Sequence, residues 1–137
     1  MGVKQGCKLS PLLFNIFLSD LPQLFDEDIK STNPILDHLS SLFWADDIVL
    51  ISETEDGMHR MLKTLEKYCE KNELTLNTDK TKCMIFNKGG RLIRTPFYYN
   101  NVKLENVNKF KYLGFLLTPS GEIMSGLKDL QDRALKG

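Results

Sequence analysis

Cysteine and long apolar runs are scarce in this sequence. Its three cysteines, Cys7, Cys69 and Cys83, are odd in number and far apart, which argues against a disulfide framework or a zinc site and favours a reducing compartment. No apolar run reaches transmembrane length, and no apolar segment typical of a signal peptide follows Met1. These features predict an intracellular protein with no membrane partner.

Net charge is also lacking, because 18 basic residues balance 18 acidic ones. Overall charge therefore does not indicate a nucleic-acid partner. The distribution is uneven, with 3 basic against 10 acidic residues from Met1 to Gly57 and 8 basic against 1 acidic residue from Lys80 to Lys111. One end is suited to cations and the other to phosphates, although two unrelated solvated surfaces would give the same pattern.

The composition is otherwise typical of a globular chain, with 42% hydrophobic and 26% charged residues. A length of 137 residues fits one domain with a buried core. Segments with helical and with strand periodicity both occur. We therefore expect an α+β fold, in which a short antiparallel sheet has two helices packed on one face.

The first predicted helix starts at Pro11 and ends near Asp20. Ser10 is placed to cap it, and Pro11 suits the first helical position. Pro22 is expected to stop this helix and to open a shorter helical turn. The polar stretch 26–41 is predicted to be a loop. The apolar residues at helical spacing are Leu13, Phe14, Phe17, Leu18 and Leu21.

The second predicted helix is amphipathic. Ser52 and Glu55 resemble a capping box at its start, and Asn72 is its predicted end. Apolar residues recur between these positions with a period of about 3.6 residues, which is typical of a helix that packs one face on a sheet. A strand over 83–86 is predicted to follow.

The last third of the sequence has strand patterns separated by turn residues. Asn100–Asn101 lies between apolar runs and predicts a hairpin over 97–104. The segment 110–118 is predicted to be a further strand, interrupted by Gly114. Residues 123–135 are predicted to form one incomplete helix.

The most informative stretch is 42–52, in which two adjacent carboxylates, Asp46 and Asp47, lie between two apolar runs. The runs predict two strands joined by a tight turn with the acids at its tip. No Lys or Arg occurs from Leu39 through Ser52, so the neighbouring carboxylates lack a counter-charge. A hard divalent cation such as Mg²⁺ fits this need. A solvated Asp-Asp turn between two core strands fits the spacing equally well.

Four segments follow one another along the chain: Gly2–Phe14, Trp44–Asp47, Leu76–Lys82 and Phe110–Gly114. Together they resemble the palm of reverse transcriptases, specifically those of non-LTR (LINE-type) retrotransposons. The resemblance covers roughly residues 2–118. It implies a palm-type antiparallel sheet with two helices on one face, a small β primer-grip hairpin and the start of a helical thumb. These parts would occupy residues 1–90, 91–118 and 119–137.

The resemblance implies an RNA-directed DNA polymerase that uses Mg²⁺, with Mn²⁺ as a possible substitute. Asp46 and Asp47 would be the catalytic carboxylates and metal ligands, as a two-metal nucleotidyl transfer requires. Lys80 would donate a proton to the leaving pyrophosphate. The partners would be an RNA template, a DNA primer and deoxynucleoside triphosphates.

The resemblance also implies binding residues around this centre. Gln5 and Gly6 would line the template and incoming-nucleotide side, and Trp44 would lie near the primer end. The primer grip would contain Phe110, Lys111, Tyr112, Leu113 and Gly114.

Three positions depart from the family pattern. The family usually has Tyr or Phe at Trp44, often Pro at Lys8 and often Gly at Glu73. The first two departures bear on fidelity or primer placement more than on the reaction.

The resemblance further implies that the fingers, most of the thumb and a palm strand with another metal-binding aspartate belong to missing parts of the same polypeptide. Two carboxylates at one tip cannot clamp two Mg²⁺ ions without a third, so we expect this chain alone to be inactive. Two other interpretations stay open. One is a non-catalytic retrotransposon remnant that at most binds nucleic acid through residues 80–111, and the other is a small metal-binding α+β domain.

Overall fold

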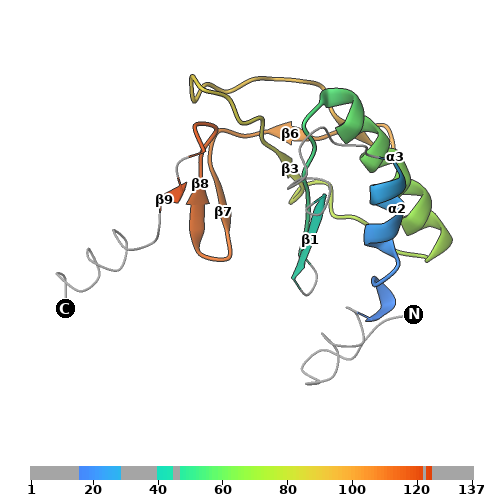
Figure 1. Ribbon diagram of the computed structural model, residues 1–137. Helices are drawn as coiled ribbons and strands as arrows, with labels where there is room; N and C mark the ends of the chain where they lie inside the picture. Colours follow the sequence, from blue (N-terminus) through green and yellow to red (C-terminus); the bar gives the residue numbers. More distant parts are fainter. Residues whose placement is uncertain (1–15, 29–39, 45–46, 122, 125–137) are drawn as a thin grey trace. The chain divides into compact units, whose positions relative to one another are not determined.

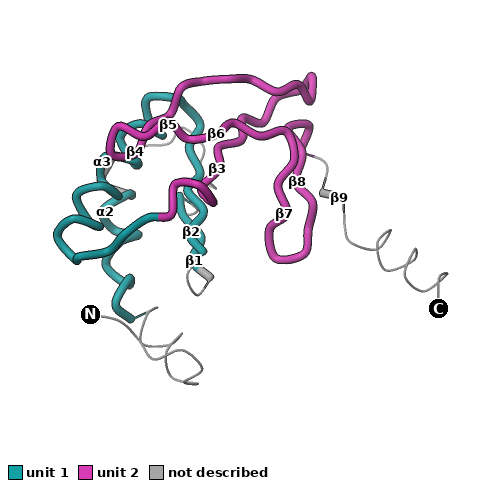
Figure 2. The backbone as a smooth tube through the Cα atoms, turned by 180° about the vertical axis from the view of Figure 1, so that it is seen from behind, with its two compact units in different colours: residues 1–76 teal, residues 77–137 magenta. Residues whose placement is uncertain are grey.

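The computed structural model describes residues 16–28, 40–44, 47–121 and 123–124 (Figure 1). The chain divides into two compact units, Met1–Leu76 and Asn77–Gly137 (Figure 2). The boundaries expected after residues 90 and 118 separate the palm, primer-grip and thumb parts that the resemblance implies, and they stay predictions. None of the described helices is long and apolar enough to cross a membrane.

The first unit is built on two helices that pack against each other. Figure 1 shows α2 (Leu21–Asp28) beside α3 (Glu55–Lys71). Burying each large apolar side chain of this kind contributes roughly 1.5–3 kcal/mol. The buried apolar residues of the unit are Leu18, Leu21, Phe25, Met61, Leu62, Leu65, Tyr68 and Cys69.

The helix at α2 is longer than the sequence pattern predicted. The predicted start at Pro11 lies outside the described residues; residues 16–17 are helical and residues 18–20 form a turn, so this helix ends before Asp20 and before Pro22 could stop it. Pro22 then occupies the second position of α2, where its missing N–H has no helical partner to lose. The prediction of only a short turn after Pro22 was wrong, because proline in a first turn starts a helix without limiting its length.

The start of α3 differs from the predicted capping box. Thr54 is the N-cap, and its side-chain oxygen accepts a hydrogen bond from the Gly57 N–H at 3.0 Å. Ser52 lies two residues before the N-cap, where its hydroxyl donates to the Thr54 carbonyl oxygen at 2.9 Å. The amphipathic helix itself is confirmed.

The end of α3 is confirmed at Asn72 and closes with a Schellman motif. The Leu74 N–H donates to the Cys69 carbonyl oxygen at 2.8 Å, and the Glu73 N–H donates to the Glu70 carbonyl oxygen at 3.3 Å. This closure places Glu73 at a φ of 54°, in the left-handed region that glycine adopts without strain. This φ gives a backbone reason for the glycine that the family resemblance leads us to expect at this position.

The described strands form four separate small sheets, one in the first unit and three in the second. The expected mixture of helices and small antiparallel sheets is confirmed, but the described strands do not join into a single antiparallel sheet. In the first unit β1 (Ser41–Trp44) pairs with β2 (Asp47–Leu50). The second unit contains β3 (Lys82–Cys83), β4 (Tyr98–Tyr99), β5 (Val102–Lys103), β6 (Glu105–Asn106), β7 (Phe110–Tyr112), β8 (Phe115–Leu117) and β9 (Ile123–Met124).

Two of these sheets correct the prediction directly. The strand expected over 83–86 is limited to β3, which pairs in parallel with β6. The helix expected over 123–135 begins instead with β9, which pairs with β8. Its remaining residues, 125–135, lie outside the described residues.

Two hairpins turn on residues with positive φ. Asn100 and Asn101 have φ values of 46° and 62°, as the type I′ turn between β4 and β5 requires, and this hairpin is confirmed. Leu113 and Gly114 have φ values of 47° and 87° and turn β7 back onto β8. The interrupted strand predicted over 110–118 is therefore a hairpin.

Candidate active site

The acidic stretch folds as the predicted hairpin. Leu42 pairs with Val49, and Trp44 pairs with Asp47 at the end of the ladder, so residues 45–46 connect the strands. The apolar, β-branched and aromatic residues on both sides favour this pairing. Asp47 is thus the first residue of β2 rather than part of the turn, while Asp46 lies outside the described residues.

The side chain of Asp47 is exposed and makes no hydrogen bond or ion pair with any other described residue. Residues 48–50, which follow it in β2, are each only partly exposed. A carboxylate at the solvent-exposed end of an otherwise apolar hairpin can bind a hard cation without first breaking a hydrogen bond or ion pair within the protein.

A complete metal site is not found within the part of the chain that the structure describes. No group of three or more His, Cys, Asp or Glu side chains there is arranged to hold a metal ion. The donors that Asp47 and its neighbour in sequence could offer, two carboxylates without a nearby Lys or Arg, still match the chemistry that Mg²⁺ prefers.

Lys80 lies in an ordered turn of the second unit. The Lys80 N–H lies 3.2 Å from both the main-chain and the side-chain oxygen of Asn77, and the Thr81 N–H donates to the same main-chain oxygen at 3.0 Å. The Lys80 side chain is exposed, and no described carboxylate pairs with it. Whether it meets Asp47, which belongs to the first unit, stays a prediction.

The basic segment 80–111 has one internal ion pair among its described residues. Lys82 on β3 pairs with Glu105 on β6 at 2.5 Å, and Lys82 Nζ also donates to the Asp79 carbonyl oxygen at 2.6 Å. Glu105 is the only acidic residue of this segment, so the other cations of the segment have no ion-pair partner within it. The exposed basic residues left in this way are Lys80, Lys88, Arg91, Arg94, Lys103, Lys109 and Lys111.

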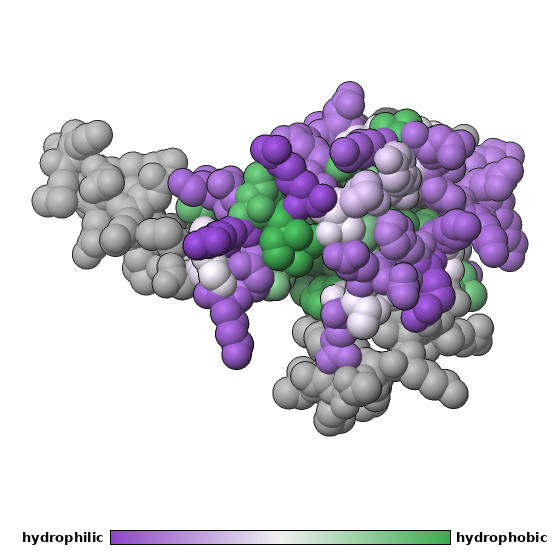
Figure 3. All heavy atoms as spheres, turned by 90° about the horizontal axis from the view of Figure 1, so that it is seen from above, coloured by the Kyte–Doolittle hydropathy of each residue, from purple (hydrophilic) through white to green (hydrophobic). Residues whose placement is uncertain are grey.

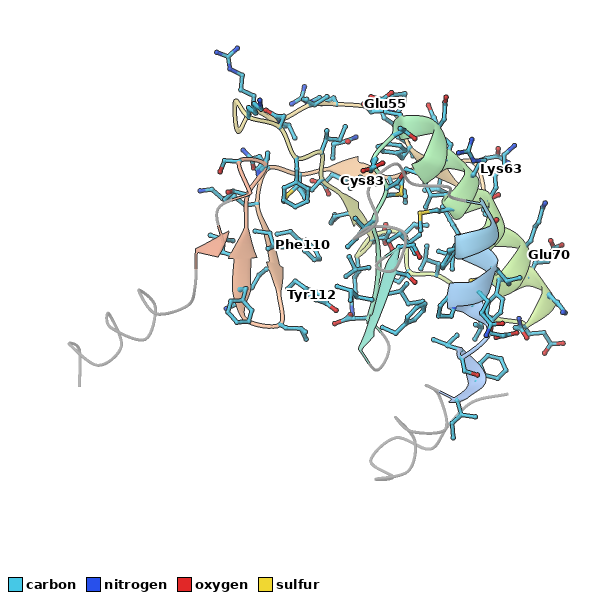
Figure 4. The ribbon with its side chains drawn as sticks, in the orientation of Figure 1. Glu55, Lys63, Glu70, Cys83, Phe110 and Tyr112 are labelled. Atoms are coloured by element: carbon cyan, nitrogen blue, oxygen red, sulfur yellow. The ribbon has the colours of Figure 1, made fainter. Side chains whose placement is uncertain are left out.

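The predicted primer-grip residues lie on the β7–β8 hairpin. Phe110 is opposite Leu117, and Tyr112 is opposite Phe115, so these four side chains share one face. None of them is buried, and Phe115 is 50% exposed. Figure 4 shows Phe110 and Tyr112 projecting to the same side of β7.

The rest of this hairpin is divided between the other face and the turn. Lys111 is paired with Leu116 on the opposite face, and Leu113 and Gly114 form the turn. Hydrophobic side chains also reach the surface among hydrophilic ones elsewhere on the molecule (Figure 3). The β7–β8 hairpin thus combines an accessible aromatic face with a cation.

Sequence reasoning missed the contribution of Phe115 and Leu117 to this aromatic face. The alternation of apolar residues on both sides of Leu113–Gly114 carries the signal, once that pair is understood as a turn. Of the other predicted site residues, Gln5 and Gly6 lie outside the described residues, and Trp44 is placed by its pairing with Asp47 alone.

A family model described as reverse transcriptase (RNA-dependent DNA polymerase) matches residues 1–117. The chain belongs to the reverse transcriptase family. This reverse transcriptase chain is 31% identical over 136 residues to the "Retrovirus-related Pol polyprotein from type-1 retrotransposable element R2" of Popillia japonica, covering 88% of the chain and 21% of the relative.

Two Drosophila melanogaster proteins are similar at the same level. The "Retrovirus-related Pol polyprotein from type-2 retrotransposable element R2DM" is 31% identical over 134 residues, 89% of the chain and 12% of the relative. The "Probable RNA-directed DNA polymerase from transposon BS" is 31% identical over 125 residues, 85% of the chain and 13% of the relative. The reverse transcriptase chain therefore spans about a fifth or less of these relatives. No solved structure is a significant match to it.

Proposed function

We propose that this chain is part of an RNA-directed DNA polymerase that transfers deoxynucleotides to a primer 3′-hydroxyl on an RNA template. One observation carries the proposal: in a chain of the reverse transcriptase family, the Asp47 carboxylate is exposed at the end of a hairpin, opposite Trp44. Asp47 holds no hydrogen bond or ion pair among the described residues, so its carboxylate oxygens are available to a cation.

The proposed metal ligands are Asp46 and Asp47, which provide the carboxylate oxygens that Mg²⁺ and Mn²⁺ prefer. Asp46 and Asp47 would hold these ions, whose chemistry there would be to lower the pKa of an attacking hydroxyl and to stabilise charge on the leaving oxygen. The role of the two aspartates is to hold that positive charge on one side of the reacting phosphate. Phosphoryl transfer needs little covalent chemistry from the protein, so the positioning of the reactants and the stabilisation of charge account for most of the catalysis.

Lys80 is the proposed proton donor to the leaving pyrophosphate. Two observations support this role. Lys80 lies on a turn whose backbone is fixed by hydrogen bonds to Asn77, and its side chain has no ion-pair partner among the described residues. Gln5, Gly6 and Trp44 are proposed to line the nucleotide, template and primer side, by family resemblance.

The β7–β8 hairpin is the proposed primer grip. Its face of Phe110, Tyr112 and Phe115, of which the first two are partly exposed and the third is exposed, can stack on bases or pack on sugars, and Lys111 adds a positive charge. Leu113 supports the assignment because a leucine at positive φ is strained, and strain of this kind is concentrated at functional sites.

Catalysis is proposed to need more polypeptide than this chain. The relatives are several times longer, and the described residues contain no third carboxylate placed to complete a two-metal site. We therefore expect the isolated chain to extend no primer.

Primer extension by the full-length polypeptide that contains this sequence tests the proposal. With poly-rA and an oligo-dT primer, we expect Mg²⁺-dependent synthesis that falls at least about a thousandfold in Asp46→Asn and in Asp47→Asn, since metal stabilisation is worth several kcal/mol. Lys80→Gln should lower the rate about a hundredfold, as loss of a general acid does.

Glu70→Gln is the matched control, because it removes one negative charge from an exposed helical position of the same unit. Its rate should equal that of the parent. Equal synthesis by the parent and both aspartate variants would refute the assigned roles. A parent that binds primer–template but makes no product would favour the non-catalytic remnant.

A further inference from the structure

Asn87 organises a tight turn over residues 87–91. Its side-chain amide donates to the carbonyl oxygens of Arg91 at 2.8 Å and of Ile85 at 3.2 Å, and its Oδ1 accepts from the Arg91 N–H at 3.2 Å. The Gly90 N–H donates to the Asn87 carbonyl oxygen at 3.0 Å, with Gly90 at a φ of 58°. These bonds fix the backbone from which the side chains of the turn project.

The turn is attached to the segment that follows the β7–β8 hairpin. The Asn87 N–H donates to the carbonyl oxygen of Pro119 at 2.8 Å. Gly90 lies against Ser120 so closely that a Cβ atom at Gly90 would be 3.2 Å from the Ser120 Cβ. The hydroxyl groups of Ser120 and Thr118, 2.9 Å apart, therefore lie beside the turn.

Two cations of this turn form no ion pair with the described residues. Lys88 and Arg91 are both exposed, and neither side chain pairs with a described carboxylate. The only acidic residue of the basic segment, Glu105, is already paired with Lys82. Two unpaired cations on a fixed backbone, with the Ser120 hydroxyl group beside it, are donors of the kind that phosphate oxygens accept. We call Lys88, Arg91 and Ser120 the basic turn surface.

We infer that the basic turn surface binds the phosphate backbone of the primer–template, as a contact separate from the β7–β8 primer grip. The inference rests on the proposed function for the identity of the nucleic acid. The hydrogen bond from Asn87 to Pro119 places the basic turn surface at the base of the hairpin that carries the aromatic face. The aromatic face would contact bases and sugars while the turn holds the charged backbone. Such a contact adds affinity without reading sequence.

Salt dependence of binding tests the inference on the 137-residue chain. The affinity for a fluorescein-labelled RNA–DNA hybrid is measured by anisotropy over a range of NaCl concentrations. We expect the double variant Lys88→Gln/Arg91→Gln to bind about three- to tenfold more weakly, and the slope of log K against log salt to shrink by nearly 2. The main-chain bonds of Arg91 in the turn are unaffected by this change.

Two further variants separate a phosphate contact from a loss of charge or of fold. Lys63→Gln/Lys67→Gln removes two exposed cations from α3, where Lys63 is visible in Figure 4, and should leave the slope unchanged. Lys88→Arg/Arg91→Lys keeps both charges and should bind like the parent. A slope that is equal in Lys88→Gln/Arg91→Gln and the parent, or that falls as much in the α3 variant, would overturn the inference.

Failure of the proposed function gives a different result. If the chain binds the hybrid through the turn but the full-length polypeptide extends no primer, the basic turn surface stands and the polymerase assignment fails. If extension depends on Asp46 and Asp47 while the turn variant binds normally, the polymerase assignment stands and the surface fails. A parent chain that binds no hybrid at low salt also refutes the surface.

Discussion

The Tyr68 hydroxyl on α3 lies 2.8 Å from Oδ1 of Asp20, in the turn that precedes α2. The same hydroxyl lies 3.0 Å from the carbonyl oxygen of Phe17. Tyr68 is buried, so its hydroxyl needs a partner inside the protein; Asp20 in the turn and Phe17 in the helical residues before it supply two acceptors. This contact ties the turn to the helix that leads away from the acidic hairpin.

Tyr68→Phe should lower the free energy of unfolding by about 1 kcal/mol near neutral pH, the net value of one such hydrogen bond. Burial, and then the hydrogen bond to Asp20, raise the pKa of Tyr68 above its ordinary value of 10.0. A phenol whose pKa is raised by folding stabilises the fold fully below the unfolded pKa, and this stabilisation is lost as pH rises toward the folded pKa. The advantage of the parent over Tyr68→Phe should therefore shrink above pH 10. Urea unfolding of both proteins from pH 8 to pH 11 measures this difference in the free energy of unfolding. A difference that grows over this range would contradict the prediction.

Glu73→Gly should stabilise the first unit by about 0.5–1 kcal/mol. Glu73 occupies the left-handed position of the Schellman motif at a φ of 54°, which costs an L-residue roughly 1–2 kcal/mol and glycine little. The matched control is Glu70→Gly, the same exchange inside α3, which should destabilise by about 1 kcal/mol. Thermal unfolding of the two variants should move in opposite directions. Equal loss of stability in both would show that the backbone at Glu73 is relaxed.

Gly114→Ala should destabilise the β7–β8 hairpin by about 1 kcal/mol through the backbone alone. A Cβ at Gly114 would meet no atom within 4 Å, but the φ of 87° disfavours any L-residue. Gly89→Ala is the comparison, since Gly89 lies outside the positive-φ region and its added Cβ would make only ordinary contacts, the nearest at 3.4 Å. Hydrogen exchange of the β7 and β8 amides should speed up in the first variant and stay unchanged in the second. Unchanged exchange in Gly114→Ala would mean that the turn tolerates a side chain.

Local patterns in the sequence were enough to predict the elements that carry the site. The apolar runs around Asp46 and Asp47 fix a hairpin, and the periodicity of α3 fixes a helix, because both depend on neighbours in the chain. Asn100–Asn101 is a further case, since asparagine tolerates the positive φ values of a type I′ turn.

The elements that were missed depend on distant or strained residues. The parallel pairing of β3 with β6 joins two-residue strands far apart in the chain, and neither strand has a pattern of its own. The turn at Leu113–Gly114 could not be predicted from the sequence because leucine rarely adopts positive φ. Gly114 was therefore interpreted as an interruption of one strand. The cations at Lys88 and Arg91 were visible in the sequence, but the hydrogen bonds that fix their turn were not.

Binding of a divalent cation by Asp46 and Asp47 is measured most directly with Mn²⁺. The full-length polypeptide, with primer–template and a non-hydrolysable nucleotide bound, is titrated with Mn²⁺ and the free ion is followed by electron paramagnetic resonance. We predict that Asp46→Asn and Asp47→Asn each weaken Mn²⁺ binding by at least about tenfold, while Glu70→Gln binds like the parent. Loss of a group that only hydrogen-bonds to a metal ligand commonly weakens metal binding by this much, so loss of a ligand itself should cost no less. Equal Mn²⁺ affinity in the parent and both aspartate variants would contradict the assignment of these carboxylates as metal ligands.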